Sequence, residues 1–305
     1  MTERPSRPTL PIITPRIDHP HRRIGTREFD LDRQAVVMAV VNRTPDSFHD
    51  HGATFALDLA VQACTAAAAA GADWVDIGGV PFSPLTPAVS TDEEVDRVLP
   101  VVEAVVAASD VVVSVDTTRA EVARQALAAG AGVINDTSCL SDPAMAEAVA
   151  GSSATLVVTH SLAAPHEWLA HPDYADVTAE VVATLDERVS AALAAGVRPE
   201  QIIIDPGHDL NKNTLHTLQV TRELGALTRL GHPVLAAVSN KDFIGETLDR
   251  PQEQRVHGSV AAATWCLMAG ARVLRMHDVD AAVDAVRMFE AIMGWRAPAR
   301  LRHNL

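Results

Sequence analysis

The sequence predicts an α/β fold of one domain, a (β/α)8 barrel of the TIM type with an N-terminal hairpin or arm. Short runs rich in β-branched residues alternate eight times with longer Ala-rich stretches of helical period. The runs are almost continuously apolar, as expected for strands buried on both faces of a parallel sheet. An open doubly wound sheet is the alternative, which is weakened because no G-x-G-x-x-G motif follows the first run.

The predicted strands cover residues 36–42, 73–78, 110–116, 131–136, 154–160, 201–206, 233–239 and 271–278. Helices are predicted near residues 54–70, 91–108, 119–129, 141–150, 174–195, 213–230, 252–269 and 279–293. Thr91 with Glu94 predicts a capping box for the second helix. Four helices are each followed by a glycine suited to a left-handed C-cap, namely Gly71, Gly130, Gly196 and Gly231.

The ends of the chain are expected to lie outside the barrel domain, which we assign to residues 24–298. Residues 1–23 are rich in Pro, Arg and His and predict an extended or partly disordered arm. Residues 24–35 predict a small hairpin or cap before the first barrel strand, and residues 299–305 a C-terminal tail.

Composition excludes several classes of function. The formal net charge of −14 argues against sequence-independent binding of nucleic acid, which requires a basic face. The three cysteines are widely spaced and form no C-x-x-C pair, which favours a reducing compartment and argues against a structural zinc site. The sequence shows neither a signal peptide nor an apolar run of about 18 residues, so we expect a cytoplasmic protein with no membrane partner.

Every predicted strand ends in polar or ionisable side chains: Asn42, Asp76, Asp116, Asn135, His160, Asp205, Ser239 to Lys241, and Arg275 with His277. In a barrel of this type the chemistry lies at the carboxyl ends of the strands. Buried polar groups cost free energy unless they are paired, so a barrel with only a core has no use for such a set. One Asp or Asn alone is as well explained as a helix cap, but the whole set in register predicts a ligand site.

The types of residue at the strand ends indicate the chemical class of the ligand. Asp116, Asn135 and Asp205 offer acceptors and a planar amide, which suit a heterocycle with several N–H donors. Lys241 is one of only two lysines among 25 basic residues, and its compact ammonium suits a ring carbonyl or ring nitrogen. Arg275 is suited to stack its planar guanidinium on the ring.

A second group is suited to an anion. His277 and Asn42 follow neighbouring strands because the eighth strand closes against the first, and together they suit an anionic leaving group with Mg²⁺. A tight catalytic zinc site is not expected, because H-E-x-x-H, paired cysteines and a three-His cluster are absent from the sequence. The three histidines between residues 160 and 171 do not share one helix face and are read as loop residues.

The ordered motifs resemble those of dihydropteroate synthase over roughly residues 24–295. They read 42-NRTPDSF-48, 76-DIGG-79, 114-SVDT-117, 134-IND-136, 205-DPG-207 with Lys212, 239-SNKDFIG-245, 258-GSVAAATW-265 and 275-RMHDV-279. The resemblance implies a barrel that binds 6-hydroxymethyl-7,8-dihydropterin diphosphate and joins it to p-aminobenzoate, releasing the diphosphate with Mg²⁺.

Carried over residue by residue, the resemblance assigns pterin binding to Asp116, Asn135, Asp205 and Lys241, with Arg275 as the stacking residue. It assigns the diphosphate to Asn42 and His277, and the metal ion to Asn42. Asp46 and Lys241 are the candidates for catalytic roles. The resemblance also implies p-aminobenzoate or sulfonamide-like ligands and a homodimer formed through the last helices, although the apolar stripe of residues 252–270 must also face the barrel.

The chain departs from the family pattern in its loops. Phe82 stands at the Thr that helps to position p-aminobenzoate, and Ser83 at the Arg that contacts the departing diphosphate. The usual Ser-Arg-Lys-Ser after the seventh strand is Ser239 to Asp242, which removes one cation and adds one anion. Further departures are Leu210 at a usual aromatic position, Thr159-His160 for Met-His, and His49 and His51 in the first loop.

These departures lead to a hypothesis about activity. In this reaction the bond to diphosphate breaks with little help from the amine, so fixed cations must stabilise the developing anion, each contributing about 3–4 kcal/mol. The sequence therefore predicts a dihydropteroate synthase homologue that keeps the pterin pocket but whose synthase activity is weak or absent. The alternatives are an active synthase in which Arg43 supplies the missing charge, a regulatory binding protein, and a transferase acting on a reduced folate.

Overall fold

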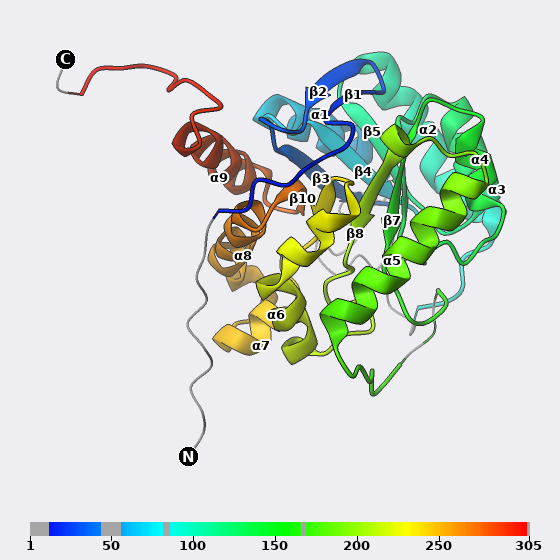
Figure 1. Ribbon diagram of the computed structural model, residues 1–305. Coiled ribbons are helices and arrows are strands. Elements are labelled where there is room, and N and C mark those ends of the chain that lie inside the picture. The colour runs from blue at the N-terminus through cyan, green and yellow to red at the C-terminus, as the bar shows by residue number, and fades with distance from the viewer. Residues whose placement is uncertain (1–11, 44–55, 82–85, 166, 168, 304–305) are drawn as a thin grey trace.

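The computed structural model describes residues 12–43, 56–81, 86–165, 167 and 169–303, and it confirms the predicted barrel (Figure 1). Eight parallel strands close in the order β10-β3-β4-β5-β6-β7-β8-β9, with β10 paired to β3. Their bounds are β3 Val36–Asn42, β4 Trp74–Gly78, β5 Val112–Asp116, β6 Val133–Asp136, β7 Thr155–Thr159, β8 Ile202–Asp205, β9 Val234–Ala236 and β10 Ala271–Met276. Each strand lies within its predicted range.

Helices surround the barrel in the predicted order (Figure 1). They are α1 Leu57–Ala70, α2 Thr91–Ala108, α3 Ala120–Ala128, α4 Met145–Ala150, α5 Val177–Ala194, α6 Thr214–Arg222, α8 Val256–Met268 and α9 Val279–Ile292. The stretch predicted as one helix over 213–230 is divided into α6 and the 3-10 helix η2, Leu224–Leu230. Among the described residues, one α-helix was not predicted: α7, Asp242–Leu248, which begins directly after the β9 loop.

The predicted cap of α2 was wrong by one residue. Ser90 has an extended backbone and its side chain accepts a hydrogen bond from the N–H of Glu93, so the helix begins at Thr91. Glu94 is buried instead and pairs with Arg119 at 2.5 Å. The four predicted glycines all have positive φ, as a left-handed helix end requires.

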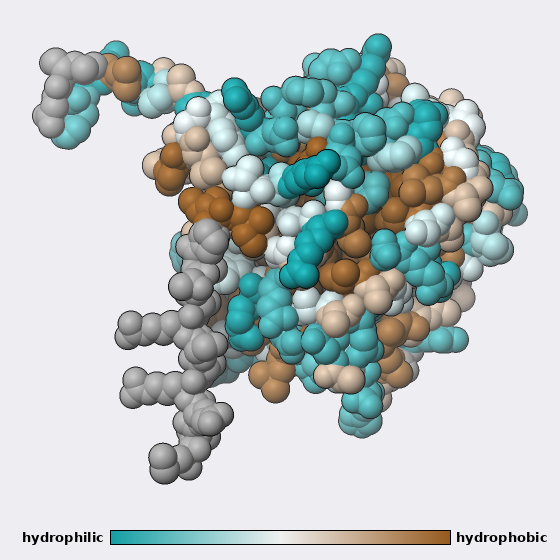
Figure 2. All heavy atoms as spheres, in the orientation of Figure 1, coloured by the Kyte–Doolittle hydropathy of each residue, from teal (hydrophilic) through white to brown (hydrophobic). Residues whose placement is uncertain are grey.

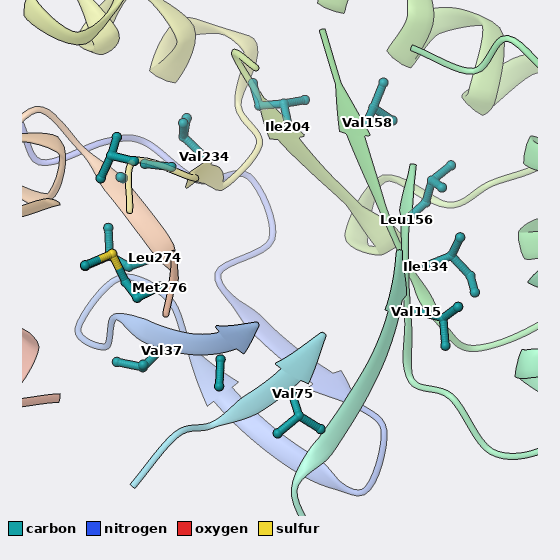
Figure 3. Close-up of a cluster of buried hydrophobic side chains, with 14 of the residues drawn as sticks. Val37, Val75, Val115, Ile134, Leu156, Val158, Ile204, Val234, Leu274 and Met276 are labelled. Carbon is teal, nitrogen blue, oxygen red and sulfur yellow. The ribbon is translucent and has the colours of Figure 1, made fainter. Parts of the chain in front are cut away.

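The apolar core has two layers that follow the alternation of each strand. One set points into the barrel and includes Met38, Trp74, Val112 and Ile203. The other set packs against the helices, and Figure 3 shows members of it on successive strands, from Val37 and Val75 to Leu274. Figure 2 shows hydrophilic residues spread over the outer surface with hydrophobic patches between them, as on an ordinary globular protein.

A two-stranded hairpin, β1 His21–Ile24 and β2 Arg27–Asp30, packs into the amino-terminal end of the barrel. Ile24 and Phe29 are buried in the inner layer, and the Phe29 ring meets Trp74 edge-on at 5.9 Å between ring centroids. The hairpin begins earlier than the predicted residues 24–35, because Arg22 is buried and donates to the carbonyl of Ile202 at 2.7 Å. The hairpin covers this end, so the carboxyl ends of the strands are left for chemistry.

Among the residues described, none of the helices combines the length and apolar character needed to cross a bilayer.

Candidate functional site

The buried carboxylate of Asp76 organises the carboxyl ends of the strands. It lies on β4, is fully buried, and accepts hydrogen bonds from Ser114 Oγ at 2.6 Å, Asn135 Nδ2 at 3.0 Å and Arg275 Nε at 2.6 Å. One side chain therefore gathers groups from β5, β6 and β10. Asp76 was predicted to lie at a strand end, but its organising role was not predicted, although a carboxylate inside an apolar run was an available signal.

Arg275 joins two carboxylates. Its Nη2 lies 3.0 Å from Asp116 Oδ2, while its Nε contacts Asp76. Burial disfavours the charged guanidinium, but Asp76 and Asp116 outweigh it and raise the pKa of Arg275. The planar group is thus fixed at the strand ends between β4 and β5, in a fork geometry suited to carboxylates.

The environment of Asp116 raises the pKa of its carboxyl group towards neutral pH. Burial raises its pKa to about 7 against the opposing charge of Arg275, and the charge of Asp76 adds to the rise. Thr137 Oγ1 donates to its second oxygen at 3.3 Å. A ligand that presents N–H donors favours the ionised carboxylate, which accepts hydrogen bonds through both oxygens.

Asn135 retains an unused acceptor. Its side chain is 1% exposed and its Nδ2 is committed to Asp76. Within the described part of the chain, Oδ1 has no hydrogen-bond partner. A buried polar atom without a partner is unusual, and a ligand N–H would satisfy it.

Asp205 and Lys241 lie at the ends of β8 and β9. Asp205 Oδ1 accepts from the N–H of Gly207 at 2.7 Å, and burial raises the pKa of Asp205 while Lys241 acts in the opposite direction. Lys241 Nζ donates to the carbonyl oxygen of His208. Burial lowers the pKa of Lys241, and the carboxylates of Asp209 and Asp205 oppose that change.

The second lysine, Lys212, holds the loop after β8. Its buried Nζ donates to the carbonyls of Gly207 at 3.0 Å and Leu210 at 3.1 Å and lies 2.9 Å from His160 Nδ1. Burial lowers the pKa of Lys212 to about 7. Gly207 has φ of 67°, and a Cβ there would lie 2.1 Å from the carbonyl oxygen of His160, so only glycine allows this approach.

Asn42 and His277 lie at the ends of the neighbouring strands β3 and β10. The N–H of His277 donates to Ser239 Oγ at 3.1 Å, and its Nδ1 is also 3.1 Å from that oxygen. The side chain of Asn42 lies close to Gly78. A Cβ atom at position 78 would lie 3.3 Å from Oδ1 of Asn42. Among the described residues no group of three or more His, Cys, Asp or Glu could hold a metal ion.

Comparison with known proteins identifies the family. The model of the pterin binding enzyme family matches residues 38–277. The chain belongs to the dihydropteroate synthase family.

Relatives of two kinds align with it along almost their whole length. An inactive dihydropteroate synthase 2 from Mycobacterium leprae is 43% identical over 285 residues, 92% of this chain and 97% of that protein. The dihydropteroate synthase of Haemophilus influenzae is 38% identical over 255 residues, 84% and 93% of the two chains. The Xanthomonas albilineans synthase solved with 4-aminobenzoic acid has a TM-score of 0.83 and 42% identity, covering 90% and 98%.

Two departures from the family pattern are explained by the loop after β9. Asn240 has φ of 57°, and its side chain turns into the protein. Its backbone N–H donates to Ser259 Oγ at 2.9 Å, and the Ser259 hydroxyl lies 3.3 Å from Asn240 Oδ1, to which it donates. Asp242 lies 3.0 Å from Arg255 Nη1, so the added anion has a counter-charge. The missing arginine is thus replaced by an inward-facing amide.

Arg43, the candidate for a compensating cation, is bound to α2. Its Nη1 donates to the carbonyl oxygens of Asp96, at 3.1 Å, and Arg97. Burial and the nearby Arg97 lower the pKa of Arg43. Asp46, Phe82, Ser83, His49 and His51 lie outside the described residues.

A separate cavity of about 400 Å³ lies at the opposite end of the barrel, between the arm and the end of α9. It is lined by Thr14, Pro15, Arg16, Ile17, Asp32, Arg33, Met293 and Trp295. It includes none of the predicted site residues.

Proposed function

We propose that the chain binds a dihydropterin, or its diphosphate, through Asp116, Asn135, Asp205, Lys241 and Arg275, and that its synthase activity is weak or absent. The observation that carries the proposal is the contrast between a convergent, buried Asp76–Asn135–Arg275 cluster and an inward-facing Asn240. The pterin side keeps its chemistry, whereas the acceptor and leaving-group side has lost a cation. The name of the M. leprae relative, an inactive synthase, supports the same division.

Each residue of the pocket has a distinct task in this proposal. Asp116, Asp205 and the unused Oδ1 of Asn135 accept hydrogen bonds from the N–H groups of the pterin. Lys241 meets a ring carbonyl or nitrogen. Arg275, fixed by Asp76 and Asp116, covers the ring face. Lys241 and Asp46 remain the candidates for catalytic roles.

Asn42 and His277 are the residues proposed to hold the diphosphate. Mg²⁺ fits this site as a partner of the diphosphate substrate, because it prefers phosphate oxygens and water and needs few protein ligands. Asn42 would supply its amide oxygen. The ion would neutralise part of the leaving group, and loss of one fixed cation beside it typically lowers the rate by about 10²–10³.

An active synthase is the second candidate. It is favoured by the X. albilineans relative, which was solved with 4-aminobenzoic acid and with 7,8-dihydropteroate at 42% identity. In that case p-aminobenzoate and sulfonamide-like compounds would be ligands of this chain. We further propose a cytoplasmic homodimer, supported by family resemblance and by the exposed Met288 and Ile292 on α9.

The decisive experiment measures binding and turnover on the same protein. Calorimetry with 6-hydroxymethyl-7,8-dihydropterin diphosphate and Mg²⁺ is expected to show binding, and addition of p-aminobenzoate is expected to give turnover at least about 100-fold below that of a synthase relative. The triple variant Phe82→Thr, Ser83→Arg, Asn240→Arg is expected to gain turnover. Thermal shifts with pterin, pterin diphosphate and a reduced folate separate the remaining alternatives.

Two outcomes contradict the proposal. Ordinary turnover by the wild-type chain would establish the active synthase and leave the altered loops as neutral variation. Stabilisation by a reduced folate but not by a pterin would favour the transferase.

A further inference from the structure

Asp209 is a partly buried carboxylate in the loop after β8, and it has no role in the proposed function. Its Oδ2 accepts from the N–H of Phe243 at 3.3 Å, so it reaches from the β8 loop to the residues that follow β9. Its own N–H donates to Thr217 Oγ1 at 3.2 Å. Burial raises the pKa of Asp209, while Lys241, the amide of Phe243, the hydroxyl of Thr217 and the amide of Asp242 act in the opposite direction.

The position of this carboxylate is fixed by its neighbours. Asp209 adopts φ of 63°, a conformation that costs free energy for a residue other than glycine unless contacts impose it. The preceding residue, His208, is fully buried, and its ring stacks on that of Phe243 with 6.4 Å between the ring centroids. The carbonyl oxygen of His208 accepts a hydrogen bond from Lys241. The carboxylate is therefore held in place rather than free to withdraw.

The N–H of Phe243 donates to Asp209, the hydroxyl of Thr217 and the N–H of Asp242 also favour its ionised form by hydrogen bonding, and the charge of Lys241 favours that form from a distance. Such a set of donors is what a protein offers to a bound carboxylate. Here the protein's own side chain satisfies it, within electrostatic reach of the lysine assigned to the ligand. A second carboxylate drawn to the same donors would meet both a filled site and a like charge.

We propose that Asp209 is a specificity-determining residue that keeps carboxylate-bearing acceptors such as p-aminobenzoate out of the site and favours an uncharged arylamine. This inference rests on the proposed pterin-binding function. Asp242 does not account for the effect, because it is exposed and already paired with Arg255 at 3.0 Å.

The test compares two acceptors that differ in charge. Calorimetry titrates p-aminobenzoate and p-aminobenzamide into protein saturated with 6-hydroxymethylpterin and Mg-diphosphate. The wild-type chain is expected to bind the benzamide at least as tightly as the benzoate. Asp209→Asn keeps the shape and an acceptor for the Phe243 amide, and is expected to bind the benzoate about tenfold more tightly with the benzamide unchanged.

Two further variants complete the design. Asp209→Gly removes the carboxylate and suits the positive φ, so it is expected to show the same gain and provides a second folded protein. Asp249→Asn is the matched control, since Asp249 is an exposed aspartate with φ of 52° at the other end of α7. It is expected to leave both affinities unchanged.

The outcomes separate this inference from the function on which it rests. Pterin binding with no gain for the benzoate in either Asp209 variant overturns the inference alone. An equal gain for both acceptors also overturns it, because it indicates added space rather than removed charge. Absence of pterin binding by the wild-type chain overturns the proposed function, and the inference with it.

Discussion

The site has two halves at the same end of the barrel, a strand half of side chains that project from the strands and a loop half of side chains on the loops after β8 and β9. The two halves differ in what holds their side chains. Asp76, Asn135 and Arg275 project from β4, β6 and β10, where the ladder fixes each Cβ, and they satisfy one another. Asp209 and Asn240 lie on the loops after β8 and β9 and bind backbone groups and neighbouring helices instead. A barrel can therefore change the residues of its loops while the side chains that project from its strands keep their arrangement.

The altered loops are nevertheless rigidly specified. Asp209, Asn211 and Asn240 all have positive φ without being glycine. Asn211 Oδ1 accepts from Ser161 Oγ at 2.7 Å and from two backbone N–H groups of the β7 loop, each at 3.0 Å. Strained residues persist only where several contacts impose them, so these loops hold one definite arrangement.

The largest effect is expected from breaking the strand half at Arg275. Arg275→Ala leaves the fully buried Asp76 without its cation, which is expected to lower the free energy of unfolding by about 3–5 kcal/mol and to abolish pterin binding. Urea denaturation and calorimetry measure the two effects.

The control for this variant is Arg124→Ala, which removes an exposed pair with Glu121 at 3.3 Å and is expected to cost no more than about 1 kcal/mol. Equal losses in the two variants would mean that the Asp76 cluster does not stabilise the strand ends.

The stability contributed by Asp116 is expected to depend on pH. The pKa of Asp116 is raised from 3.8 to about 7 by burial, so its contribution to stability is present in acid and is lost as pH rises through 7. The stability of wild type relative to Asp116→Asn is therefore expected to fall between pH 4 and 7, by up to about 1.4 kcal/mol per pH unit. Urea denaturation at several pH values checks this, with Asp92→Asn on α2 as the exposed control. A difference that does not vary with pH contradicts the stated environment of Asp116.

The smallest effect is expected in the loop half. Asn240→Arg places a long side chain where Asn240 is 7% exposed and bonded to Ser259, and is expected to cost about 1–2 kcal/mol of stability. Asn240→Gly, which suits the positive φ, is expected to cost less. Thermal denaturation of both variants is the measurement, and an arginine variant as stable as wild type would mean that this loop readily turns outward.

The sequence predicted the barrel and the polar side chains at its strand ends because the signals for both are local. Strand period and polar strand ends are read within a few neighbouring residues, and eight such units allow few topologies. The short helix α7 was not predicted, because its seven residues, 242–248, make only about two turns and show no clear helical period.

The directions of individual side chains were decided only by the tertiary structure. Arg275 meets Asp76 across 199 residues of sequence, Arg43 meets Arg97 across 54, and Asp209 meets Phe243 across 34. The sequence supplied the charges of Arg43, Asn240 and Asp209 but not the partners that hold them, because those partners become neighbours only when the barrel closes. Which groups Arg43, Asn240 and Asp209 contact is therefore a property of the folded chain.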